Sequence, residues 1–216
     1  LTLNGVAVTS GQSVTAANIT SGLLRYTPAA NANGAANAAF TFQVRDNGGT
    51  LNGGIDLDPT PNTMTINVTS VNDAPAGTDT TVTTLEDTVY TFTTSNFGFT
   101  DPNDVPGNTL LSVTITTLPA TGSLTLNGVA VTAGQSIAVA SITGGLLRFT
   151  PAANANGLAN ASFTFQVRDD GGTANSGVDL DASPNTMTIN VTAVNDAPAG
   201  TDTTVTTLED TQYTFT

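Results

Sequence analysis

The feature that most constrains this chain is a long internal repeat. LTLNGVAVTSGQ begins at Leu1 and LTLNGVAVTAGQ begins at Leu124, and this spacing holds without an insertion to the last residue. Residues 1–93 and 124–216 differ at only 17 positions. A domain-sized period predicts a tandem array in which each period is one structural unit. We therefore expect the C-terminal part of a repeat at 1–71, a complete repeat at 72–194 and the N-terminal strands of the next repeat at 195–216. The simplest interpretation is a window on a longer array.

The hydrophobic pattern of the repeat is that of β-strands. Apolar residues alternate with polar ones in SFTFQV (162–167), in TMTINV (186–191) and in LSVTIT (111–116). In these runs the pattern predicts that Phe163 and Phe165, Met187 and Ile189, and Leu111 and Val113 face a core. The counterparts of the aromatic residues in the other copy, Tyr26, Phe40 and Phe42, are expected to be core residues too. No stretch has a sustained helical period.

Turn signals separate these runs at regular intervals. Asn127-Gly128 lies between LTL and VAV and is a strong signal for a two-residue hairpin. Clusters of Gly, Pro, Asn and Asp separate the other runs. Seven or more short strands within about 120 residues are typical of a two-sheet sandwich with Greek-key connections. The predicted fold class is all-β, a tandem array of immunoglobulin-like sandwiches.

The charge of the chain is strongly one-sided. It has 17 acidic and 4 basic residues and no His, which gives a net charge of −13. Such a polyanion is repelled by nucleic acids and anionic lipids, so we expect neither nucleic-acid binding nor membrane insertion. There is no Cys, which excludes disulfides and thiolate metal sites. Without His, Cys or Lys, no base or activated nucleophile is recognisable, and an enzyme is not expected.

Most acidic residues fall at the two ends of the predicted sandwich. Traced in immunoglobulin-like order, the complete repeat begins at an upper end, and both its first and its last strand run to a lower end. The upper end gathers acids from the linker and two loops, and the lower end holds Glu86 and Asp87 beside the exit linker. The candidate ligands are Asn72, Asp73, Glu86, Asp87, Asp101, Asn103, Asp104, Asp169, Asp170, Asp179, Asp181, Asn195 and Asp196. Each acidic cluster thus lies at a junction between repeats.

Clustered carboxylates repel one another, and four Arg residues cannot pair with all of them. Ca²⁺ resolves the repulsion, since it takes six to eight oxygen ligands in flexible geometry. Mg²⁺ fits less well because it demands strict octahedral geometry, and Zn²⁺ would require His or Cys. The alternative is that Asp and Asn only shape turns and keep the loops soluble. Arg168, which precedes Asp169 and Asp170, is expected to form a local ion pair or to balance the cluster.

Several motifs together resemble one known family. FTFQVRDDGG, TMTINVTAVNDAPAGTD, LEDT, DPND and LLRFTPAANANG resemble the bacterial cadherin-like tandem repeats of giant surface adhesins and biofilm-associated proteins. The resemblance covers essentially the whole chain. It implies cadherin-like sandwich repeats of an extracellular stalk, carried on a long, exported polypeptide. In cadherins, junction Ca²⁺ is held by an acid after the first strand, by the linker and by a D-x-D loop. The resemblance assigns these roles to Glu86 or Asp87, to Asn195-Asp196, and to Asp101, Asn103 and Asp104.

Three functions compete. The favoured one is a non-catalytic spacer in cell-surface adhesion or biofilm, rigidified by Ca²⁺ between neighbouring repeats of the same chain or fibre. The second is a module that binds glycan, ice or protein, although the absence of Trp offers no aromatic platform. The third is a self-assembling extracellular filament. There, other copies of the chain would be the partners, joined by strand exchange between incomplete repeats.

Overall fold

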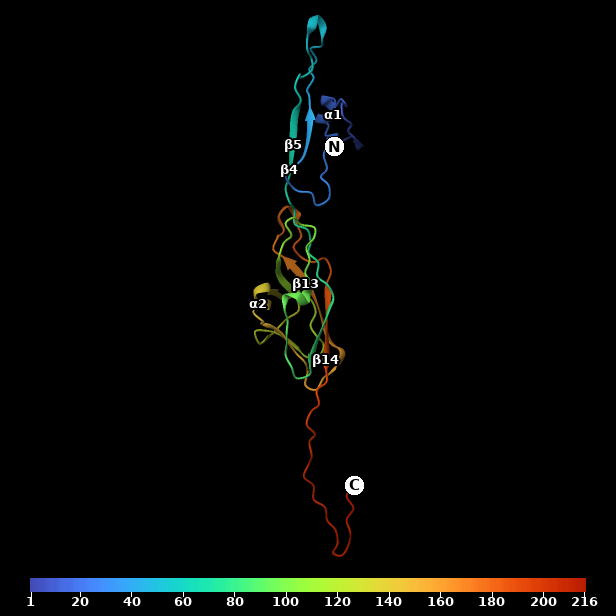
Figure 1. The fold of residues 1–216 in the computed structure, drawn as a ribbon, viewed down its shortest axis with the longest axis vertical. Helices are drawn as coiled ribbons and strands as arrows, with labels where there is room; N and C mark the ends of the chain where they lie inside the picture. The colour runs from blue at the N-terminus through green and yellow to red at the C-terminus, as the bar shows by residue number, and fades with distance from the viewer.

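The computed structural model describes all 216 residues and shows an elongated molecule (Figure 1). Residues 1–71 form one end, a compact sandwich forms the middle, and the C-terminal segment extends from the other end. The strands are β1 (Thr2–Leu3), β2 (Val6–Ala7), β3 (Leu24–Arg25), β4 (Gly34–Phe42), β5 (Asn62–Val68), β6 (Thr80–Leu85), β7 (Tyr90–Thr91), β8 (Leu110–Ile115), β9 (Ser123–Leu126), β10 (Val129–Ala130), β11 (Ser136–Ala138), β12 (Leu147–Thr150), β13 (Gly157–Asp169) and β14 (Asn185–Thr192). The helices are α1 (Ala16–Thr20), α2 (Val139–Thr143) and the short 3₁₀ turns η1 (Leu51–Gly53), η2 (Thr94–Phe97) and η3 (Ala174–Ser176).

The middle part is a two-sheet sandwich. One sheet has the strand order β10-β9-β12-β7, and the other has the order β11-β8-β13-β14-β6. The pair β14-β6 is parallel, whereas the other pairs are antiparallel. Both sheets contribute to one core of 18 buried apolar residues. The predicted immunoglobulin-like sandwich is therefore confirmed.

The predicted hairpin is present in the structure. Strands β9 and β10 pair with Leu126 opposite Val129, and the two turn residues, Asn127 and Gly128, have φ angles of 50° and 79°. Positive φ at both positions is what a type I′ turn requires, and Asn-Gly adopts it at little cost. The same sequence forms the same turn between β1 and β2 at Asn4-Gly5.

The predicted alternation holds on β13 and β14 and fails on β8. Phe163, Phe165, Met187 and Ile189 are at most 1% exposed. On β8, Val113 is buried as predicted, but Leu111 is 47% exposed, so its assignment to the core was wrong. The reason is a bulge. Arg168 of β13 pairs with Ser112 and Asp169 pairs with Leu110, which leaves Leu111 without a partner and turns it to solvent.

Residues 1–71 share the sequence of the back of the sandwich but not its burial. They form a three-stranded sheet, β2-β1-β3, and a separate hairpin, β4-β5. All 27 buried residues of the molecule lie between Pro75 and Val191. Tyr26 and Phe40 are only half-buried and Phe42 is 36% exposed, so these three are not core residues in this chain. Their counterparts are covered by β6, β7, η2 and β8, and no such elements lie over 1–71.

Candidate functional site

The upper end of the sandwich, which faces residues 1–71, brings an acidic cluster together. Asp73 lies on the linker, Asp101 and Asp104 lie on the loop before β8, and Asp169 ends β13. The backbone N–H of Asp73 donates to Oδ2 of Asp104 at 3.0 Å. The side-chain amide of Asn72 donates to both carboxylate oxygens of Asp169, at 3.1 and 3.3 Å, and to the carbonyl of Val178 at 2.6 Å. The linker is thus tied to both loops through the predicted acidic residues.

Asn108 belongs to this cluster and was missed in the sequence. Its backbone N–H donates to Oδ2 of Asp101 at 2.8 Å, and its side-chain amide reaches Asn72 and, at 3.5 Å, Asp104. A Cβ at Gly171 would overlap the side chains of Asn72 and Asn108, so this network requires glycine there. The amide oxygen and the position of Asn108 at the end of the DPNDVPGN loop were signals that could have identified it.

Asp101 has an unfavourable electrostatic environment in the cluster. Its Oδ1 is buried and has no hydrogen-bond partner. Burial raises the pKa of Asp101, and the charges of Asp104 and Asp73 raise it further against the hydrogen bond from Asn108. Burial also raises the pKa of Asp169, with the charges of Asp101 and Asp179 adding to the effect. The end of the sandwich therefore concentrates negative charge that the chain's own cations leave uncompensated.

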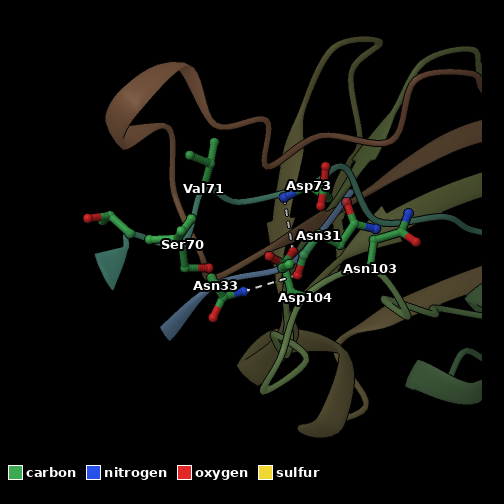
Figure 2. Close-up of a pocket in the computed structure, with 10 residues that line it drawn as sticks. Asn31, Asn33, Ser70, Val71, Asp73, Asn103 and Asp104 are labelled. Atoms are coloured by element: carbon green, nitrogen blue, oxygen red, sulfur yellow. Dashed lines mark hydrogen bonds between the residues drawn. The ribbon is translucent and has the colours of Figure 1, made fainter. Parts of the chain in front are cut away.

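A pocket at the junction is lined from both sides (Figure 2). Asn31, Ala32 and Asn33 come from the loop before β4, and residues 68–71 come from the end of β5 and the start of the linker. On the side of the sandwich, the pocket is lined by Asp73 of the linker and by Asn103 and Asp104 of the loop before β8. Within the pocket, the side-chain amide of Asn33 donates to the carbonyl of Asn31 at 3.4 Å. The pocket is thus lined mainly by polar residues of two consecutive repeats.

Three predicted ligands of the upper end have protein partners of their own. Asp170 accepts from the N–H and hydroxyl of Thr109, both at 2.7 Å, and these bonds lower its pKa. Asp179 forms an ion pair with Arg168 at 2.7 Å, which is the local ion pair expected of this arginine. Asp181 accepts from Gly77, Ser183 and Asn185 at 2.9, 3.1 and 2.6 Å, which fastens the linker to β14. No group of three or more acidic side chains converges in the geometry of a metal site.

The lower end presents one buried acid and several exposed groups. Glu86 is 4% exposed and accepts from the N–H of Val194 at 2.5 Å and from the amide of Asn156 at 3.0 Å. These two bonds, the first being the stronger influence, lower the pKa of Glu86. Asp87 is exposed and has a left-handed backbone with φ of 58°. Asn195 and Asp196 are also exposed, and the amide of Asn195 donates to the carbonyl of Asp196.

The two ends are related by the repeat. Asn156 and Val194, which hold Glu86, correspond to Asn33 and Val71 at the repeat spacing. Asn33 and Val71 both line the pocket of the upper junction. The pocket in Figure 2 is therefore the position that an acid equivalent to Glu86 would occupy.

The fold and this end-to-end arrangement define an immunoglobulin-like repeat module. The sequence model of the bacterial Ig domain family matches residues 72–192, and the chain belongs to that family. Neither the curated proteins nor the solved structures contain a significant match. No helix of the chain has the length and apolar character needed to cross a membrane.

Proposed function

We propose that the chain is a non-catalytic spacer segment of a bacterial surface protein, whose junctions between repeats are stiffened by Ca²⁺. In this proposal the repeats are the cadherin-like, VNDAP-containing type, and the array holds an adhesive part away from the cell in adhesion or biofilm formation. Membership of the bacterial Ig domain family supports a structural repeat of a surface protein. Extracellular localisation follows from that role.

The observation that supports the proposal is a pocket at the junction that is lined by residues of two consecutive repeats. Asp73, Asn103 and Asp104 line the pocket from one side, and the counterparts of the two residues that hold Glu86 line it from the other. In a continuous array, a Glu at the lower end of each repeat would lie beside the acids at the upper end of the next. Ligands from both repeats would then restrain the angle between them.

The donor chemistry fits a hard cation. The cluster offers carboxylate and amide oxygens and no nitrogen or sulfur ligand, which suits Ca²⁺. Asp101 has a buried oxygen without a partner, and the amides of Asn72 and Asn108 donate to carboxylates where a cation would compensate the charge. We assign the ligand roles to Asp73, Asp101, Asn103 and Asp104, with Asp169 adjacent. Bound Ca²⁺ would supply the positive charge that the four carboxylates lack.

The test is thermal unfolding of the 216-residue chain in excess Ca²⁺ and in excess EDTA. Ca²⁺ at a hundredfold excess over Kd adds about 2.7 kcal/mol to the free energy of unfolding, so Tm rises by several degrees. Asp101→Asn, which removes one carboxylate charge, should lose most of that gain. Asp202→Asn makes the same charge change at an exposed residue and should keep it. A wild-type Tm that is equal in Ca²⁺ and EDTA contradicts the proposal.

A further inference from the structure

The side-chain amide of Asn156 holds Glu86, the buried acid at the lower end of the sandwich. Glu86 lies in the turn after β6, and only 4% of it is exposed. Its carboxylate accepts from the amide of Asn156 at 3.0 Å and from the N–H of Val194 at 2.5 Å. Val194 follows β14 and begins the exit linker. The amide of Asn156 therefore supports the contact that ties this linker to the sandwich.

Asn156 is followed by Gly157, and an asparagine before glycine is open to attack by the main chain. The nitrogen of the following residue can reach the side-chain Cγ and close a five-membered ring, an approach that a side chain on that residue would hinder. Glycine allows this close approach, and the space where a Cβ of Gly157 would lie is open. Asn156 is exposed and lies in irregular backbone directly before β13, so water reaches it.

A neighbouring side chain favours the reaction at this peptide bond. The amide of Asn160 donates to the main-chain carbonyl of Asn156 at 3.2 Å. That carbonyl belongs to the same peptide group as the N–H of Gly157. A hydrogen bond to the carbonyl polarises the group and makes its N–H more acidic. Because the nitrogen attacks after it has lost its proton, Asn160 promotes the ring closure.

We propose that Asn156 is a site of spontaneous deamidation, which converts its contact with Glu86 into a pair of carboxylates. The nitrogen of Gly157 loses its proton and attacks Cγ of Asn156, and the side-chain nitrogen takes up a proton and leaves as ammonia. Water then opens the cyclic imide at either carbonyl and leaves aspartate or isoaspartate. The net reaction consumes one water and releases one ammonia, and it requires no other reactant.

The product holds the lower end of the sandwich less firmly. Either product replaces the amide donor by a carboxylate beside the carboxylate of Glu86, so an attraction becomes a repulsion. Isoaspartate also lengthens the main chain by one carbon directly before Gly157, which pairs with Val191 of β14. The exit linker of an aged repeat is thus tied more loosely than that of a new one. This change is independent of the proposed Ca²⁺ role, because it is covalent and proceeds in EDTA.

The test is to age the 216-residue chain in EDTA at mildly alkaline pH and to map its peptides by mass spectrometry. A carboxyl should replace the amide at Asn156, and the aged chain should have a Tm several degrees below that of fresh chain, because a hydrogen bond to a charged group is lost. Asn156→Gln keeps an amide, but its attack would need a six-membered ring, which closes more slowly. On ageing, this variant should keep the Tm of its own fresh sample.

Asn127-Gly128 supplies the matched control, because it is an exposed Asn-Gly pair of the same sandwich whose side chain holds no acid. Asn127→Asp should change Tm by about 1 °C or less, since Asp tolerates this turn and the site is at the surface. Asn156→Asp makes the same charge change and should reproduce the Tm loss seen on ageing. It should also speed hydrogen exchange at the N–H of Val194 severalfold. An Asn156 that stays intact while urea-unfolded chain is modified there, or equal Tm values for the two Asp variants, would overturn the proposal.

Discussion

At the scale of single residues, the acidic side chains of the repeat fall into two electrostatic groups. Burial raises the pKa of Asp101 and Asp169, so their charged forms are disfavoured by folding. Backbone and side-chain hydrogen bonds lower the pKa of Glu86 and Asp170, so their charged forms are favoured. The first group places unfavourable negative charge at the end of the sandwich, and the second holds loops and linker in place.

The pH dependence of stability in EDTA should differ in sign between Asp101 and Glu86. A folded-state pKa above the ordinary value of 3.8 means that Asp101 lowers the free energy of unfolding as pH rises through its folded pKa. A pKa below the ordinary value of 4.5 means that Glu86 adds stability above that pH and loses it as pH falls through its folded pKa. In urea titrations, Asp101→Asn should therefore be more stable than wild type at pH 7, and Glu86→Gln less stable.

The difference for Asp101→Asn should shrink as pH falls and should be lost below the ordinary value of 3.8, and that for Glu86→Gln should shrink as pH falls through the lowered folded-state pKa of Glu86. Asp202→Asn, at an exposed residue, serves as the control for net charge. A lower stability of Asp101→Asn than of wild type at pH 7 would contradict this prediction. It would mean that the charged carboxylate of Asp101 stabilises the folded state.

Part of the site could be predicted from the sequence, and part could not. Asp73, Asp101, Asp104 and Asp169 were predicted to meet, because strand direction and loop position place them at one end, and the structure brings them together. Asp170, Asp179 and Asp181 were placed at the same end, but their partners Thr109, Arg168 and Gly77 could not be paired with them from spacing alone. Asn108 was missed because its role depends on the path of the loop between Asp101 and β8.

At the scale of elements, local rules predicted turns and strands better than irregularities. The Asn-Gly hairpin and the alternation on β13 and β14 follow from short-range patterns. The bulge on β8 does not, because it depends on how β8 pairs with β13. The one-turn helix α2 has no helical period to detect, yet it inserts Ile142, which is 1% exposed, into the core.

Because of the bulge, two apolar residues of β8 should contribute differently to the free energy of unfolding. Ile115 is fully buried, so Ile115→Ala should cost about 2–5 kcal/mol in the free energy of unfolding. Leu111 is turned to solvent, so Leu111→Ala should change it by about 0.5 kcal/mol or less. Chemical denaturation of the two variants checks the pair, and a cost above about 2 kcal/mol for Leu111→Ala would show that the strand is paired without the bulge.

At the scale of the whole molecule, nearly identical sequences have different burial because of what lies over them. Phe165 is fully buried and Phe42 is 36% exposed, although both lie in FTFQVRD. The repeat spacing predicted where one sandwich begins and the next follows, but burial depends on β6, β7, η2 and β8, which cover only one of the two copies. Sequence similarity between two repeats therefore predicts the same strand positions in both. It does not predict the same burial, and so it does not predict the same stability.

This difference predicts the pattern of proteolysis. All buried residues of the 216-residue chain belong to the sandwich, so a non-specific protease should leave a resistant fragment close to residues 72–194. Residues 1–71 and 195–216 expose their backbone and should be removed first. Mass spectrometry of the fragments checks this order of cleavage. Because Phe165 is fully buried and Phe42 is 36% exposed, cleavage within β13 should be far slower than cleavage within β4. Equal rates of cleavage in the two strands would contradict the prediction, since they would mean that the same sequence is equally protected in both copies.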